Sequence, residues 1–146
     1  MQYTIDGTKG ETLMSQTTFL DTDYATLWYH PEPQIVHHAF KRFIYGPEFR
    51  NVLNTGLDIF KKHGAHKWLS DDRNNSALPT EVLVWGMEEW APQVFELGWK
   101  YWAIVMPDKI AGQLTMNRIM KRYIDQGLSI QVFSDSDEAL KWLESV

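Results

Sequence analysis

Side chains that could do chemistry are concentrated in a polar run that follows the short predicted strand at residues 66–70. In open α/β sheets, ligands bind beside the loops that leave the strands, so this run is a natural place for a site. Its carboxylates, guanidinium, amide and hydroxyls come from Asp71, Asp72, Arg73, Asn74, Ser76 and Thr80. We take Asp72, Arg73, Asn74, Ser76 and Thr80 as the candidates for contact with a partner or ligand.

Two adjacent carboxylates, Asp71 and Asp72, suit a hard cation, yet neighbouring side chains seldom converge on one ion without further oxygen ligands. An ion pair between an aspartate and Arg73 would hold the loop in place and explains the same residues. Catalysis would need a pocket in which Asp71 or Asp72 meets a histidine. We therefore favour a structural tether, keep ligand or partner contact as the alternative, and assign no catalytic residue.

Ser76 and Thr80 stand near the start of a predicted helix. A phosphate there would meet free backbone N–H groups and the positive end of the helix dipole. Helix capping needs the same residue types in the same places. We expect capping, with phosphorylation as the alternative.

The five histidines form no familiar metal-binding pattern. A zinc site needs at least about three converging protein ligands, and the chain has no cysteine to supply one. His37 and His38 are neighbours on a predicted strand, so they point to opposite faces of the sheet. The chain also has no Ser-His-Asp order and no Gly-rich phosphate loop. We predict no metal and no cofactor.

The aromatic content is high, with seven Trp, six Tyr and seven Phe. Such a surplus is expected around a ligand pocket or on a partner surface. The candidate pocket residues, all large and apolar, are Trp85, Trp90, Trp102 and Met116. The alternatives are ordinary core packing and a dimer surface, and we expect homodimerisation on this basis.

Length and charge narrow the class of protein. The chain has 146 residues, so we predict one domain over residues 1–146, with residues 1–14 as a flexible or irregular N-terminal segment. A formal net charge of −5 and the lack of a Lys/Arg stripe argue against nucleic acid. No apolar run reaches the roughly 18 residues of a membrane span. The absence of cysteine suits a reducing compartment, and we expect the cytoplasm.

The first half of the chain predicts three antiparallel strands and a helix. Short β-branched and aromatic segments place the strands at residues 17–20, 25–29 and 34–45. Pro47 and Gly64 bracket an amphipathic segment of helical periodicity. A fourth strand is predicted at residues 66–70.

The second half alternates helices and strands. Pro79 starts a second helix, which Pro92 must kink or interrupt. The apolar run 101–106 predicts a central parallel strand, and residues 129–133 predict the last strand. Residues 110–124 form a third helix whose predicted apolar face is Leu114, Met116, Ile119, Met120 and Tyr123. Ser134 or Asp135 caps a final helix. The order βββ-α-β-α-β-α-β-α predicts an α/β fold with a mixed sheet and helices packed on it.

Three segments carry a family resemblance: WLSDDRN at residues 68–74, YWAIVMP at residues 101–107, and DSDEALKWL at residues 135–143. From about Trp28 onward, the chain resembles the STAS-like superfamily. Within it, the chain looks most like small stand-alone bacterial proteins grouped with sporulation anti-sigma-factor antagonists.

This resemblance implies a STAS-like fold and a non-catalytic regulatory role. In the antagonists, a serine after this loop is phosphorylated to control binding to a partner kinase. Ser76 and Thr80 stand there, although the family's Asp-Ser-Ser-Gly signature is absent. A relationship drawn to CRAL-TRIO lipid-transfer domains implies an enclosed apolar ligand. We therefore expect a protein-interaction module that binds its partner through the polar run. The alternative is a carrier or sensor of a small apolar ligand.

Overall fold

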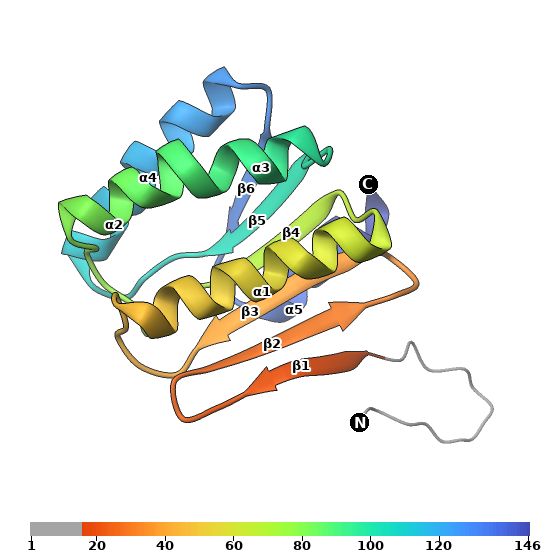
Figure 1. The fold of residues 1–146 in the computed structure, drawn as a ribbon, viewed down its shortest axis with the longest axis horizontal. Helices are drawn as coiled ribbons and strands as arrows, with labels where there is room; N and C mark the ends of the chain where they lie inside the picture. The colour runs from red at the N-terminus through yellow and green to blue at the C-terminus, as the bar shows by residue number, and fades with distance from the viewer. Residues whose placement is uncertain (1–15) are drawn as a thin grey trace.

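The computed structural model describes residues 16–146. Its centre is one six-stranded sheet in which the strands lie in chain order, β1-β2-β3-β4-β5-β6 (Figure 1). The predicted α/β class and mixed sheet are confirmed. The predicted N-terminal segment at residues 1–14 lies outside the described residues.

The first three strands form the antiparallel half of the sheet. They are β1 (Thr17–Asp21), β2 (Ala25–His30) and β3 (Ile35–Phe40). The prediction that the third strand reaches residue 45 is wrong. Residues 41–43 are exposed, and the backbone N–H of Ile44 donates to Asn75 Oδ1 instead of a neighbouring strand.

The other three strands run parallel to β3 and to one another. They are β4 (Lys67–Asp71), β5 (Tyr101–Val105) and β6 (Ser129–Phe133). The predicted central parallel strand is confirmed as β5, which lies between β4 and β6. Parallel neighbours need crossover connections, and helices supply them here.

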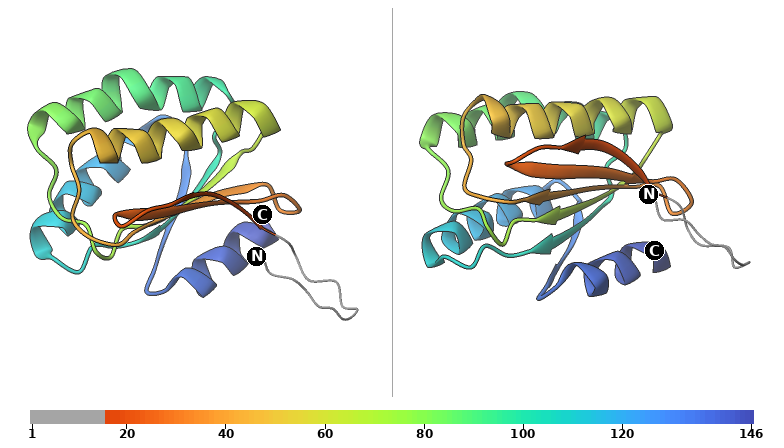
Figure 2. Two further views of the ribbon diagram at one scale, coloured as in Figure 1. Left: turned by 60° about the horizontal axis from the view of Figure 1, so that its bottom comes forward. Right: turned by 90° about the horizontal axis from the view of Figure 1, so that it is seen from below.

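Helices cover both faces of the sheet (Figure 2). The larger core packs against α1 (Pro47–His63), the segment from α2 (Thr80–Trp85) to α3 (Ala91–Glu96), and α4 (Ile110–Asp125). The smaller core lies under α5 (Ser136–Ser145) on the opposite face. Successive side chains of β5 point to opposite faces of the sheet and so contribute to both cores. The larger core contains Trp102 and Ile104, and the smaller core contains Ala103 and Val105.

Two helix ends follow their predicted signals. Gly64 ends α1 in the left-handed conformation at φ 64°, with its N–H bonded to Phe60 O. The Asp135 side chain caps α5 by accepting from the N–H of Glu138 at 2.9 Å. One predicted face needs correction, because Leu114 of α4 is 61% exposed and lies outside the core.

The segment expected to be kinked by Pro92 contains a π-helix, η1 (Gly86–Trp90), between α2 and α3. Proline lacks an N–H and its ring clashes with the carbonyl four residues earlier in an α-helix. Just before it, the N–H of Ala91 reaches back five residues to Gly86 O. The wider turn accommodates Pro92 and carries Trp90 into the core.

A glycine sets how closely α1 approaches the sheet. Gly56 faces Trp68 of β4, and a Cβ there would lie 2.7 Å from Trp68 Cζ2 and closer still to Cη2. Trp68 is 1% exposed and packs against Phe60 and Trp90. The indole ring therefore occupies the space that a side chain at residue 56 would need.

None of the helices described within residues 16–146 is both long and apolar enough to cross a membrane.

We predict that Gly56→Ala destabilises the fold by about 1–3 kcal/mol, the usual cost of overpacking a filled core. The measurement is urea unfolding followed by Trp fluorescence. Gly86→Ala is the control, because Gly86 has helical dihedral angles and, outside its own stretch of helix backbone, no atom of the described residues lies within 4 Å of the position that a new methyl group would take. The free energy of unfolding of Gly86→Ala should rise by up to about 1 kcal/mol, because alanine has a higher helix propensity than glycine. An equal loss in both variants would contradict the close approach of α1 to Trp68.

Candidate ligand-binding site

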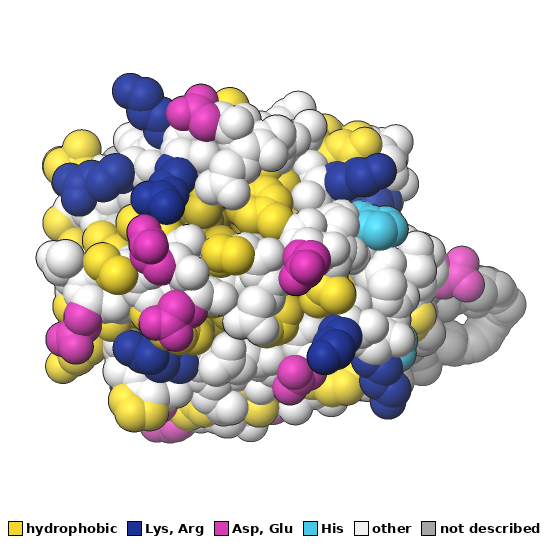
Figure 3. Space-filling view, turned by 45° about the horizontal axis from the view of Figure 1, so that its top comes forward, with side chains coloured by type: hydrophobic (Ala, Val, Ile, Leu, Met, Phe, Trp, Pro, Cys, Tyr) yellow, Lys and Arg dark blue, Asp and Glu magenta, His cyan; other side chains and the backbone are white. Residues whose placement is uncertain are grey.

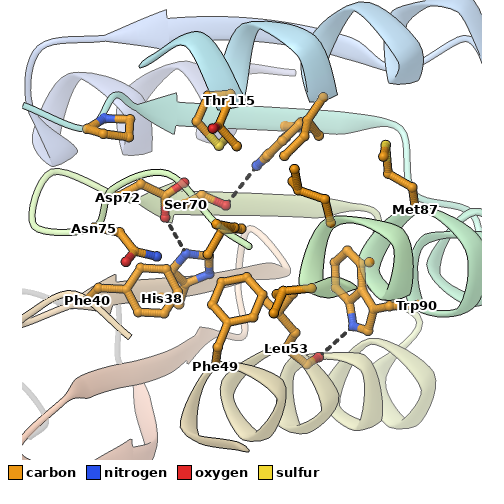
Figure 4. Close-up of a pocket in the computed structure, with 18 of the residues that line it drawn as sticks. His38, Phe40, Phe49, Leu53, Ser70, Asp72, Asn75, Met87, Trp90 and Thr115 are labelled. Carbon is orange, nitrogen blue, oxygen red and sulfur yellow. Dashed lines mark hydrogen bonds and ion pairs between the residues drawn. The ribbon is translucent and has the colours of Figure 1, made fainter. Parts of the chain in front are cut away.

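A cavity of about 80 Å³ lies between the sheet and the helices of the larger core (Figure 4). Its floor is formed by side chains of β3, β4 and β5. Its roof comes from α1, the α2–η1 segment and α4. Half-buried side chains of Ser76, Leu78, Met87 and Ile119 stand at its outer rim.

Seven aromatic rings make up most of the wall. We call this set the aromatic wall: Phe40, Phe49, Trp68, Trp90, Trp99, Trp102 and Tyr123. Neighbouring indoles meet at steep angles, 83° between Trp68 and Trp90 and 75° between Trp90 and Trp99. Rings packed edge to face in this way surround a space on several sides, whereas parallel rings would fill it as a stack.

Every indole N–H of the aromatic wall donates a hydrogen bond within the protein. Trp90 donates to Leu53 O at 2.9 Å, and Trp99 donates to Tyr101 O at 3.2 Å. Trp102 donates to Ser70 Oγ at 2.8 Å. These bonds fix the ring orientations and leave apolar ring surface for the cavity.

The polar end of the cavity is built on a chain of hydrogen bonds from Trp68 through His38 to Asp72. Trp68 Nε1–H donates to His38 Nδ1 at 3.0 Å, and His38 Nε2 lies 2.9 Å from Asp72 Oδ1. An indole nitrogen can only donate, so Nδ1 must be the acceptor. The proton of neutral His38 therefore sits on Nε2 and is donated to Asp72.

The backbone holds Asp72 in place. Its N–H donates to Val105 O at 2.9 Å, and its carbonyl accepts from the N–H of Asn75 at 2.9 Å. The side chain is buried and lines the cavity. Within residues 16–146 no group donates to its second oxygen, Oδ2. That oxygen is available to a ligand.

Two further buried polar side chains border this end. Ser70 Oγ accepts from Trp102, which leaves its hydroxyl proton free to donate. Asn75 Oδ1 accepts from the N–H of Ile44 at 3.2 Å, which leaves its NH₂ group as a donor. The polar end thus combines one carboxylate acceptor with two neutral donors.

The charge around the cavity has one sign. Among the described residues that line it, Asp72 is the only acid and none is Lys or Arg. Burial raises the pKa of Tyr123, so its phenol stays neutral at physiological pH. Outside the cavity, acidic and basic side chains are interspersed on the helical face (Figure 3).

Asp71, although adjacent to Asp72, belongs to the other face of the sheet. Arg73 donates to both of its carboxylate oxygens, Nε at 3.0 Å and Nη2 at 2.7 Å, and Ser136 Oγ donates at 2.8 Å. Burial alone would raise the pKa of Asp71, but the hydrogen bonds from Arg73 and Ser136 outweigh it and hold that pKa below its ordinary value. The expected Asp–Arg pair is therefore present, and it also ties the loop to α5.

Only two of the five predicted contact residues line the cavity. Asp72 and Ser76 line the cavity, whereas Arg73 turns to Asp71. Asn74 Nδ2 donates to Phe40 O at 3.0 Å. Thr80 is exposed at the first residue of α2. The capping prediction is wrong for this helix, because Pro79 occupies the N-cap and no side chain of the described residues caps the free N–H groups.

The predicted pocket residues are mostly brought together. Trp90, Trp102 and Met116 all line the cavity. Trp85 does not line the cavity; its half-buried ring packs against the larger core and lies under the guanidinium of Arg50, 4.8 Å from the ring centroid.

Sequence reasoning missed His38 as a site residue. It placed His37 and His38 on opposite faces, and the structure agrees: His37 contacts His30, whereas His38 contacts Asp72. The pairing of residues 34 positions apart depends on β3 and β4 being parallel neighbours, with His38 opposite Ser70. Predicting that adjacency would have brought His38 and Asp72 together.

No protein-family model, curated protein or solved structure matches this chain. Among residues 16–146, no three histidine or acidic side chains gather in an arrangement that could hold a metal ion.

A pair of histidines, His30 and His37, lies on the face of the sheet opposite the cavity. His30 Nε2 and His37 Nδ1 are 3.1 Å apart, and His37 Nε2 is buried without a hydrogen-bond partner among residues 16–146. Burial lowers the pKa of His30 from 6.5 to about 4. Burial, together with the neighbouring His30, lowers the pKa of His37 from 6.5 to about 3. Both rings are therefore neutral in the folded protein at physiological pH.

We predict that acid destabilises the protein through these two histidines. Below pH 6.5 the unfolded chain takes up protons that the folded chain refuses until about pH 4 for His30 and about pH 3 for His37. Stability should fall as pH drops through this window, by up to about 1.4 kcal/mol per pH unit for each histidine. Thermal unfolding between pH 7 and pH 4 measures the slope.

His37→Leu should flatten that slope, whereas His63→Gln, which replaces an exposed histidine, should leave it unchanged. A slope in His37→Leu as steep as in the wild type would show that other groups carry the acid sensitivity.

Proposed function

We propose that this protein binds a small, largely apolar ligand in the cavity and acts as its carrier or sensor. The observation that carries the proposal is the aromatic wall with its four bonded indole N–H groups, closed at one end by the buried Asp72 carboxylate, whose Oδ2 receives no hydrogen bond from residues 16–146. Ligand sites in proteins typically combine mostly apolar walls with a few fixed polar groups.

The cost of the cavity supports this reading. Scaling from core truncations, about 24 cal/mol per Å³, an empty space of 80 Å³ would cost at most about 2 kcal/mol, the value for a fully enclosed cavity. Protein stability is small enough for such a loss to matter. A ligand would remove this cost by restoring contacts to the surrounding rings.

The hydrogen bonds around His38 favour binding over catalysis. Asp72 and a histidine do meet in a pocket, which is the arrangement an enzyme would need. Both ring nitrogens of His38 are engaged inside the protein, however, one by Trp68 and one by Asp72. His38 therefore has no nitrogen free for proton transfer with a ligand, and we assign it a positioning role.

The absence of cysteine fits a reducing compartment, and we infer a cytoplasmic location from it.

The test is native mass spectrometry of protein purified from its own host. We expect the wild type to carry a bound small molecule. Met116→Trp should lose it, because residue 116 lines the cavity and the larger ring would fill it. Met120→Trp is the matched control on the same helix, at a half-buried position outside the cavity lining, and should retain the ligand.

Two results would contradict the proposal. One is a wild-type protein without any bound molecule and without any thermal shift against a library of small apolar compounds. The other is retention of the ligand by Met116→Trp, which would place it elsewhere.

A second candidate is a regulatory protein-interaction module, which the STAS-like resemblance implies. It is supported by two exposed apolar side chains one turn apart on α4, Ile110 and Leu114, which are 73% and 61% exposed. Residues at this spacing share one side of a helix. Apolar side chains grouped on a surface are typical of protein interfaces, including those of homodimers. A ligand-free cavity in the experiment above would leave this candidate ahead.

A further inference from the structure

The charge of the cavity indicates what kind of head group its ligand carries. Within the described part of the chain, no group donates to Oδ2 of the buried Asp72 carboxylate and no residue that lines the cavity is Lys or Arg. A buried carboxylate without a cationic partner is unfavourable. A ligand that brings a positive charge would supply the missing partner.

His38 cannot supply that charge while its present hydrogen bonds hold. An imidazolium needs a proton on both nitrogens, but Nδ1 accepts from the indole N–H of Trp68 at 3.0 Å. Adding a proton to Nδ1 would place two donors against each other. Trp68 therefore keeps His38 neutral, and the Asp72 carboxylate remains uncompensated.

The aromatic wall is suited to the same kind of ligand. The faces of aromatic rings are electronegative and attract cations, Trp most strongly, and cages of such rings recognise alkylated ammonium groups. Four Trp rings surround this cavity, and two of them, Trp68 and Trp102, contribute indoles that are hydrogen-bonded beside Asp72, to His38 and Ser70. A hydrated ammonium would lose more water here than an alkylated one, which is already partly apolar.

The size of the cavity also fits an alkylammonium head. A water-sized group needs at least about 10–15 Å³, so 80 Å³ holds roughly five such groups. Five non-hydrogen atoms make up a trimethylammonium group with its first methylene. The rest of the ligand would extend toward the rim at Ser76, Leu78 and Met87.

We propose that the ligand is an organic cation, an alkylated amine whose head is enclosed by the aromatic wall with Asp72 as its counter-ion. This inference rests on the proposed ligand-binding function and narrows its ligand class. It also excludes fatty acids, because their carboxylate would lie beside that of Asp72 at the polar end.

Three compounds of nearly the same shape test the inference. Choline carries a trimethylammonium group, 3,3-dimethylbutan-1-ol is its neutral carbon counterpart, and 3,3-dimethylbutanoate adds a negative charge. Isothermal titration calorimetry of the wild-type protein should show choline binding at least about tenfold more tightly than the alcohol, and no binding of the anion.

Asp72→Asn should bring the affinities for choline and the alcohol close together, by weakening choline and leaving the alcohol unchanged. Asp108→Asn is the control, because it removes the same charge from an exposed residue next to the lining residue Pro107. It should keep the wild-type ratio. Should Asp72→Asn fail to fold, the comparison of the three compounds on the wild type still decides the matter.

The outcomes separate this inference from the proposed function. Binding of the alcohol or the anion as tightly as choline would contradict a cationic head group. The protein would then still bind a small apolar ligand, as the proposed function states. Absence of binding by all three compounds would also overturn the inference. The fate of the proposed function would then depend on the molecule retained in native mass spectrometry.

Discussion

The hydrogen bond from Trp68 to His38 is the interaction on which the rest of the site depends. It fixes the proton of His38 on Nε2, and that proton holds Asp72 at the end of the cavity. Because both ring nitrogens are then engaged, the same bond keeps the histidine neutral, and no other described residue donates to the second carboxylate oxygen of Asp72. One donor on a buried indole thus sets the tautomer and the charge of His38 and, through His38, the position of the Asp72 carboxylate.

The surrounding fold serves to keep Trp68 where this bond can form. Parallel pairing of β3 and β4 brings the two strands that carry His38 and Trp68 side by side. Gly56 leaves the space above the indole empty of any side chain. The π-helix η1 brings Trp90 edge-on against Trp68, with the two ring centroids 5.2 Å apart. The cavity lies beside this packed centre, where α4 and the rim residues cover it.

Much of the fold could be predicted from the sequence, because it rests on local patterns. The helix between Pro47 and Gly64, the cap at Asp135 and the buried run of β5 each follow from a few adjacent residues. The predicted third strand is too long because Phe43, Ile44 and Tyr45 are β-branched or aromatic like the strand before them, although Asn75 takes the N–H of Ile44. The site was harder to predict. Its aromatic wall could be suspected from composition, but the pairing of His38 with Asp72 depends on which strands are neighbours in space.

The most direct test of this account is the protonation state of His38 in the free protein, measured by ¹⁵N–¹H correlation NMR on histidine-labelled protein with His38→Gln for assignment. The account predicts a neutral ring at pH 7 with its proton on Nε2 and with Nδ1 at the chemical shift of a hydrogen-bond acceptor. A ring protonated on both nitrogens would contradict it, because His38 would then neutralise Asp72 and the cavity would offer no uncompensated charge to a ligand.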